Sequence, residues 1–92
     1  MQDVNEDGSM LLRKRIKELI SLEYGSVADF YHHLYGERAS KSKLQTFRNY
    51  LNRGKVGGEF LLLLSKKTSF GQASLAQLFD AELSSEDLFG KR

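Results

Sequence analysis

The chain of 92 residues contains neither cysteine nor proline. The absence of cysteine excludes disulfides, thiolate zinc sites and cysteine nucleophiles. Long hydrophobic runs are also lacking, because the longest, Phe60–Leu64, is far shorter than the ~20 apolar residues that a membrane-spanning helix needs. The first nine residues, MQDVNEDGS, are polar and acidic and do not resemble a secretory signal peptide. These absences predict a cytoplasmic protein that does not contact a membrane.

The sequence also lacks the motifs of catalytic and cofactor sites. His32 and His33 are adjacent, so on a helix they would point about 100° apart and could not share a metal ion. The segment RGKVGGEF has three glycines but lacks the Gly-Lys-Ser/Thr ending and the preceding strand of a P-loop. Asp29 and Asp80 are better explained as a helix cap and a helix-end or loop acid than as an acid/base pair. We therefore expect no enzyme activity, no metal, no cofactor and no small-molecule substrate.

The formal net charge of +2 is unevenly distributed. Residues 36–56 contain six basic residues and one acid, whereas residues 1–9 and 74–92 are net acidic. The basic residues of the first range are Arg38, Lys41, Lys43, Arg48, Arg53 and Lys55. Positive charge gathered in one segment, beside hydrogen-bonding side chains, indicates a polyanionic partner, although a solvated surface carries charge as well.

Apolar residues recur with helical spacing along most of the chain, and no stretch alternates as a strand does. The expected helices are Met10–Leu22, 26–35, Ser42–Asn52, Glu59–Lys67 and Ser74–Phe79, with Ser84–Phe89 as a sixth if its Ser-x-x-Asp cap forms. We therefore predict a compact all-α fold of five or six helices. It forms one domain over residues 10–92, preceded by a disordered acidic segment at residues 1–9.

Glycine and serine residues mark the expected helix ends. Gly25 and Gly36 follow apolar helical segments, where a left-handed residue commonly ends a helix. For the third helix, Ser42 and Gln45 have the spacing of a capping box, with Ser40 as the alternative cap.

Successive helical residues rotate by about 100°, which divides the Ser42–Asn52 helix into two sides. Leu44, Phe47 and Leu51 gather on one side and are expected to face the core. The other side carries Ser42, Gln45, Thr46, Asn49 and Arg53, with Lys43 and Tyr50 at one edge and Arg48 at the other. Glutamine, asparagine and arginine side chains can bond to base edges, and the cations Lys41, Lys43, Arg48 and Lys55 suit phosphates. Any surface helix has a polar side, so this pattern alone is weak evidence for DNA binding. The following helix, Glu59–Lys67, strengthens it, because that helix is expected to be mostly buried.

Three segments in this order resemble the lambda-repressor-like, or Xre-type, helix-turn-helix family. SVADFYHHLYG is similar to that family's second helix, and SKLQTFRNYLNRG to its recognition helix. EFLLLLSKKTSFGQASLAQLF is similar to its fourth helix, glycine-containing loop and short fifth helix. The resemblance covers residues 10–79, although the turn YGERASKS is about four residues longer than the tight turn of the family.

The resemblance implies a lambda-repressor-like bundle that binds double-stranded DNA sequence-specifically, often as a homodimer on a two-fold operator. The chain would be a small bacterial or phage transcription regulator, in particular a repressor. By this resemblance, the base-contacting residues would be Ser42, Lys43, Gln45, Thr46 and Asn49. Phosphates would be contacted near Ser26 and from Arg53 to Lys55, with Lys41 and Arg48 added from the charge pattern.

The apolar C-terminal segment supports a rival interpretation, a protein-interaction module such as an antitoxin or adaptor. Under the DNA hypothesis the same residues would form a dimer interface, with residues 80–92 as a dimerisation tail. The expected interface residues are Leu78, Phe79, Leu83, Leu88 and Phe89. A third alternative is that these residues only close the core of the domain.

Overall fold

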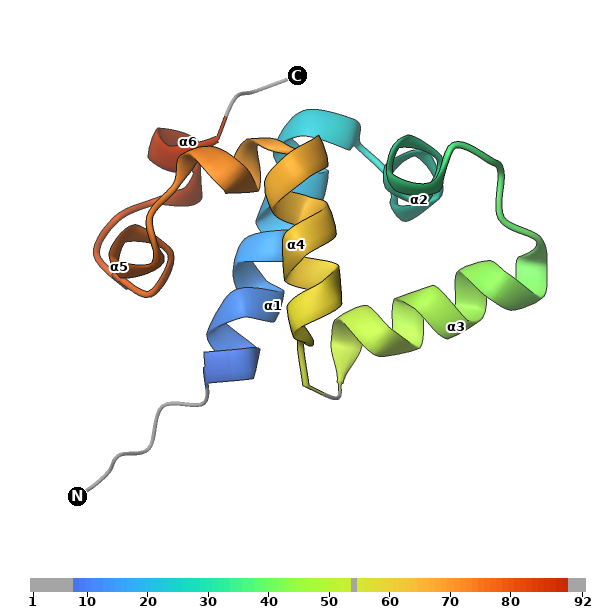
Figure 1. Ribbon diagram of the computed structural model, residues 1–92, viewed down its shortest axis with the longest axis horizontal. Helices are drawn as coiled ribbons and strands as arrows, with labels where there is room; N and C mark the ends of the chain where they lie inside the picture. The colour runs from blue at the N-terminus through green and yellow to red at the C-terminus, as the bar shows by residue number, and fades with distance from the viewer. Residues whose placement is uncertain (1–7, 54, 90–92) are drawn as a thin grey trace.

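A computed structural model of the chain describes residues 8–53 and 55–89, and all regular secondary structure within these ranges is helical, as expected (Figure 1). The α-helices are α1 (Gly8–Leu19), α2 (Val27–Tyr35), α3 (Lys41–Asn52), α4 (Gly58–Lys67), α5 (Leu75–Leu78) and α6 (Ser85–Leu88). A π-helix, η1 (Ile20–Tyr24), extends α1, and a 3₁₀-helix, η2 (Ser69–Gln72), follows α4. None of the helices in the described ranges is long and apolar enough to cross a membrane.

The predicted helix breaks are confirmed where local chemistry determines them. Gly25 and Gly36 adopt left-handed conformations, with φ of 86° and 76°, and each ends a helix. The Ser26 Oγ accepts a hydrogen bond of 3.1 Å from the backbone N–H of Asp29, as expected of an N-cap. Ser74 caps α5 in a reciprocal capping box. These helix ends depend only on interactions between residues close together in the chain, so sequence patterns predict them well.

The first helix differs from its expected bounds at both ends. It begins at Gly8, so Gly8 and Ser9 belong to α1 and not to the expected disordered segment; residues 1–7 lie outside the described residues. At its other end the chain does not stop at Leu22 but continues as a π-helix to Tyr24, where the Gly25 N–H donates to the Ile20 carbonyl at 2.7 Å.

Helix α3 is capped by Ser40, the alternative that the sequence left open, and not by Ser42. The Ser40 Oγ accepts from the Lys43 N–H at 3.2 Å, and the Ser40 backbone is extended. Ser42 therefore lies inside the first turn of α3, where its hydroxyl is free of the capping role. The helix ends at Asn52, the expected last residue. Gly54, the last residue of the resembling segment SKLQTFRNYLNRG, lies outside the described residues.

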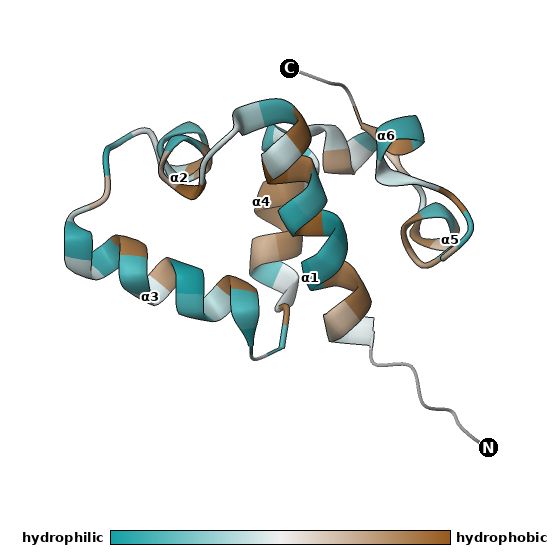
Figure 2. Cartoon of the chain, turned by 180° about the vertical axis from the view of Figure 1, so that it is seen from behind, coloured by the Kyte–Doolittle hydropathy of each residue, from teal (hydrophilic) through white to brown (hydrophobic). Residues whose placement is uncertain are grey.

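The core lies where α1, α2, α3 and α4 meet. Its most deeply buried side chains are Ile16, Leu19, Phe30, Leu34 and Leu64. Phe47 and Leu51 of α3 join this cluster, as the helical pattern predicts. Figure 2 shows the hydrophobic residues of α3 turned toward the rest of the molecule and its hydrophilic residues turned outward. Two expectations are corrected: Leu44 is only half-buried, and α4 is not buried on most sides, since Leu62 is 55% exposed.

A buried arginine that sequence reasoning missed holds the C-terminal segment on α1. Arg15 is 7% exposed. Its Nη1 donates to the Ser85 Oγ at 2.8 Å, and Ser85 in turn donates to the Glu18 carboxylate. The guanidinium also donates to four backbone carbonyls, those of Gln77, Leu78, Asp80 and Leu83, at 2.7–3.3 Å. The sequence signal was the position of Arg15, because it lies on the same buried side of α1 as Leu12, Ile16 and Leu19.

The C-terminal apolar residues divide between the core and the surface. Leu78 and Phe89 are buried in the core of this chain, 5% and 4% exposed, so they are not available to a partner. Leu83 and Leu88 are half-buried. Phe79 stays 39% exposed. The third alternative, closure of the core, therefore accounts for Leu78 and Phe89, and the expected dimer interface loses these two residues.

Candidate nucleic-acid interface

Helix α3 forms an outer edge of the molecule, on the side away from α5 and α6 (Figure 1). In the same view α2 is seen end-on while α3 lies across the picture, so the two axes are strongly inclined to each other. The long connection at residues 36–40 separates the two helices. Phe47 of α3 packs on both neighbouring helices, because its ring centroid lies 6.1 Å from that of Phe30 in α2 and 6.1 Å from that of Phe60 in α4. Core contacts thus hold α3 on one side and leave its other side open.

All of the residues expected to contact bases are exposed on α3. They are Ser42, Lys43, Gln45, Thr46 and Asn49. Two of them are already paired, since the Gln45 Nε2 donates to the Asn49 Oδ1 at 3.1 Å. This bond orients both amides and leaves the Gln45 carbonyl oxygen and the Asn49 NH₂ for a ligand. The pair therefore presents an acceptor and a donor side by side, as recognition of a base edge requires.

The other three residues, Ser42, Lys43 and Thr46, line a groove that sequence reasoning did not foresee. It lies between α2, α3 and the start of α4, and its volume is about 930 Å³. The five aromatic residues that line it are Tyr31, Tyr35, Phe47, Tyr50 and Phe60. The expected contacts thus fall into two groups, an amide pair and a set at the mouth of an aromatic groove.

The aromatic rings of the groove form a continuous chain of contacts. Tyr31 lies 4.6 Å from Tyr35 and 5.3 Å from Phe47, measured between ring centroids. On the other side, Tyr50 lies 5.2 Å from Phe60, and the Tyr50 Oη accepts from the Gly57 N–H at 3.0 Å. These edge-to-face and tilted contacts stabilise the rings in place. The i, i+4 spacing of Tyr31 and Tyr35 was the available sequence signal, but it does not reveal what faces them.

Tyr35 is the most accessible of these rings, at 45% exposed. Burial of part of the ring raises the pKa of the Tyr35 hydroxyl above its usual value of 10.0, and the nearby Tyr31 and Tyr50 hydroxyls add to the rise. The side chain is therefore neutral at physiological pH and can act as an uncharged stacking surface with a hydrogen-bonding end.

The basic residues around α3 differ in their partners. Arg38 pairs with Asp29 at 3.0 Å, and the Lys43 Nζ lies 3.8 Å from a Glu37 carboxylate oxygen. The expected phosphate contacts Lys41, Arg48, Arg53 and Lys55 are exposed and make no ion pair with the part of the chain that the structure describes. Their charge is therefore available to an anionic partner.

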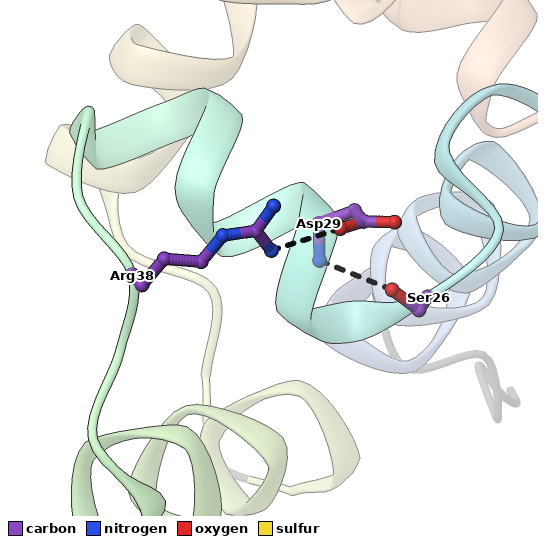
Figure 3. Close-up of polar contacts among 3 residues, drawn as sticks. All are labelled: Ser26, Asp29 and Arg38. Carbon is purple, nitrogen blue, oxygen red and sulfur yellow. Dashed lines mark hydrogen bonds and ion pairs between the residues drawn. The ribbon is translucent and has the colours of Figure 1, made fainter.

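The start of α2 carries the remaining expected phosphate contact, Ser26. Figure 3 shows Arg38 reaching from the 36–40 connection to Asp29, beside the Ser26 cap. The Ser26 hydroxyl accepts from the Asp29 N–H, so its own proton remains free to be donated. Arg38 offsets the Asp29 charge, which would otherwise repel a phosphate at this helix start.

Within residues 8–53 and 55–89, no three histidine, aspartate or glutamate side chains are grouped closely enough to hold a metal ion. His33 lies at the far end of α2, where its Nε2 is 2.7 Å from the Lys67 carbonyl oxygen.

Comparison with protein-family models, curated proteins and solved structures found no match to this chain.

Proposed function

We propose that this chain binds double-stranded DNA sequence-specifically, with α3 as the recognition helix. The observation that carries the proposal is the open side of α3. It combines the oriented Gln45–Asn49 pair with exposed cations on both sides of the helix. A helix with its side chains is about 10–12 Å wide and matches the major groove of B-DNA, about 12 Å across.

Three further features support this function. Residues 36–56 carry six basic residues and one acid, which favours a polyanion. Helix α2 is strongly inclined to α3 and starts with the Ser26 cap, as a helix that meets the DNA backbone would. The sequence resemblance to lambda-repressor-like proteins points the same way. We accordingly propose that the protein is a small bacterial or phage transcription regulator that represses by occupying its operator.

The test begins with selection of preferred duplexes from a random pool by the wild-type chain. Affinity for one selected duplex and for a scrambled duplex is then measured for Q45A/N49A and for the control Q72A, which removes an exposed amide from η2. We expect the α3 variant to lose about 1–3 kcal/mol of discrimination per good bidentate contact, and the control to lose none. Unchanged discrimination in the α3 variant would refute α3 as the reading helix.

We also propose that the protein acts as a homodimer through the apolar residues exposed on α5 and directly after it. Leu75 is 67% exposed and Phe79 is 39% exposed, and both lie far along the chain from α3. Sedimentation equilibrium should give a dimer for the wild type and a monomer for L75E. A wild-type monomer at high concentration would remove the two-fold operator from the proposal. If DNA binding fails as well, the same exposed residues favour the rival interaction module.

A further inference from the structure

Recognition of DNA by α3 alone does not account for the aromatic groove between α2, α3 and α4. Five aromatic side chains line it, and its volume of about 930 Å³ is in the range of small-molecule sites. Tyr35 presents a partly exposed ring in this groove, beside the helix that is proposed to bind DNA.

The position of the groove indicates which partner it faces. Ser42, Lys43 and Thr46 line the groove, and they also belong to the exposed side of α3 that is proposed to enter the DNA. A duplex placed on α3 would therefore bring its bases to the mouth of the groove. The surrounding segment is strongly basic, which attracts a nucleic acid and repels a basic peptide.

The polar groups of the groove complement the edge of a base. The Lys43 ammonium is a donor, the Glu59 carboxylate at the start of α4 is an acceptor, and the Ser42 and Thr46 hydroxyls can be either. A base edge carries both acceptors and exocyclic amino donors, and carboxylates accept from such amino groups. Aromatic rings stack on the faces of bases irrespective of sequence, provided that the base is unpaired.

We propose that the groove of Tyr31, Tyr35 and Tyr50 takes up an unpaired base of the bound DNA, stacked on the exposed ring of Tyr35. The inference rests on the proposed DNA binding and goes beyond it, because recognition of a paired duplex by α3 does not require the groove. The preferred substrate is then a duplex with an unpaired or easily extruded base next to the site read by α3.

The chain provides its own probe, because it contains no tryptophan and three of its four tyrosines line the groove. Ultraviolet-excited emission therefore comes from tyrosine, and stacking of a base on Tyr35 should quench it. We would titrate the protein with a selected 20-base-pair duplex and with the same duplex carrying one unpaired cytosine. The expected result is about tenfold tighter binding of the bulged duplex, with stronger quenching.

Two substitutions at one position separate stacking from mere apolar contact. Y35F keeps the aromatic face and should keep the preference for the bulged duplex, whereas Y35L keeps an apolar side chain and should lose it. Y24F is the control, since Tyr24 packs on Phe30 and His33 outside the groove. Far-UV circular dichroism checks that the variants are folded. As a second measurement, 2-aminopurine in place of the unpaired cytosine should be quenched by the wild-type protein.

The outcomes distinguish this inference from the proposed function. Equal affinity of the wild type for paired and bulged duplexes, or a preference that persists in Y35L, would overturn the inference. In either case, sequence discrimination that is lost in Q45A/N49A would leave α3 as the recognition helix. Loss of the bulge preference in Y35L, with paired-duplex binding unchanged, would support the inference.

Discussion

Two arginine-containing surfaces of this molecule use the same side chain in opposite ways. On α1, Arg15 is buried and donates to the Ser85 hydroxyl and to four backbone carbonyls of the C-terminal segment. Around α3, Arg48 and Arg53 are exposed and make no ion pair within the described residues. A guanidinium whose donors are satisfied inside the fold stabilises that fold, whereas one left in water remains available to a ligand. Charge counting cannot separate the two roles, but burial and hydrogen bonds can.

The largest effect is expected at Arg15. R15M keeps much of the side-chain length but removes one donor from each of the carbonyls of Gln77, Leu78, Asp80 and Leu83. The bond to Leu78 is buried and the other three are partly buried. The free energy of unfolding should fall by about 3 kcal/mol, measured by urea denaturation. K17M, an exposed substitution on the same helix, is the control and should change stability by less than about 0.5 kcal/mol. Similar stability of R15M and K17M would mean that Arg15 does not anchor the C-terminal segment.

The opposite behaviour is expected of two exposed arginines, Arg48 on α3 and Arg53 directly after it. R48Q/R53Q should leave the urea midpoint nearly unchanged. Under the proposed function it should weaken DNA binding, because it removes two of the proposed phosphate contacts. The slope of log affinity against log salt should become shallower by about 1.8, measured between 50 and 200 mM salt. K66Q, at the far end of α4, is the control. An unaltered slope in R48Q/R53Q would show that these cations do not meet phosphates.

An intermediate case lies at Arg38, whose ion pair with Asp29 is exposed. The two side chains are 66% and 53% exposed, so solvent screens their attraction. R38M should therefore destabilise the fold by less than about 1 kcal/mol in urea denaturation. A loss as large as that of R15M would contradict the view that burial, and not the arginine itself, decides the contribution to stability.

The smallest effect concerns pH. Burial raises the pKa values of Tyr24 and Tyr35 above 10.0, with the neighbouring charge of Glu23 adding to the rise at Tyr24. Because the folded state favours the neutral phenols, their contribution to stability is fully present below pH 10 and is lost as the pH rises through the folded-state pKa values. Thermal melts at pH 9 and pH 11 should show a decline in stability that is smaller in Y24F/Y35F.

Features that depend on a few neighbouring residues could be predicted. The left-handed glycines Gly25 and Gly36, the Ser26 cap and the inward position of Phe47 follow from spacing within one or two helical turns. The N-cap of α3 lies at the alternative Ser40, two residues before Ser42, and the helix begins at Lys41. Both serines can cap a helix, and the extended backbone at Ser40 distinguishes them. The exposure of the polar side of α3 was likewise predictable, since it is the reverse of its apolar side.

The sequence by itself determined the helical segments, the helix ends at Gly25 and Gly36 and the polar side of α3, because hydrogen bonds and caps between close neighbours decide these features. Only the tertiary structure decided the role of Arg15, whose partners lie 62–70 residues away along the chain. It also decided the aromatic groove, where α2, α3 and α4 each contribute part of the wall, and the burial of Leu78 and Phe89. The physical reason is the same in each case: burial and the completion of a polar site depend on which distant segments pack together, and helical periodicity does not specify that partner.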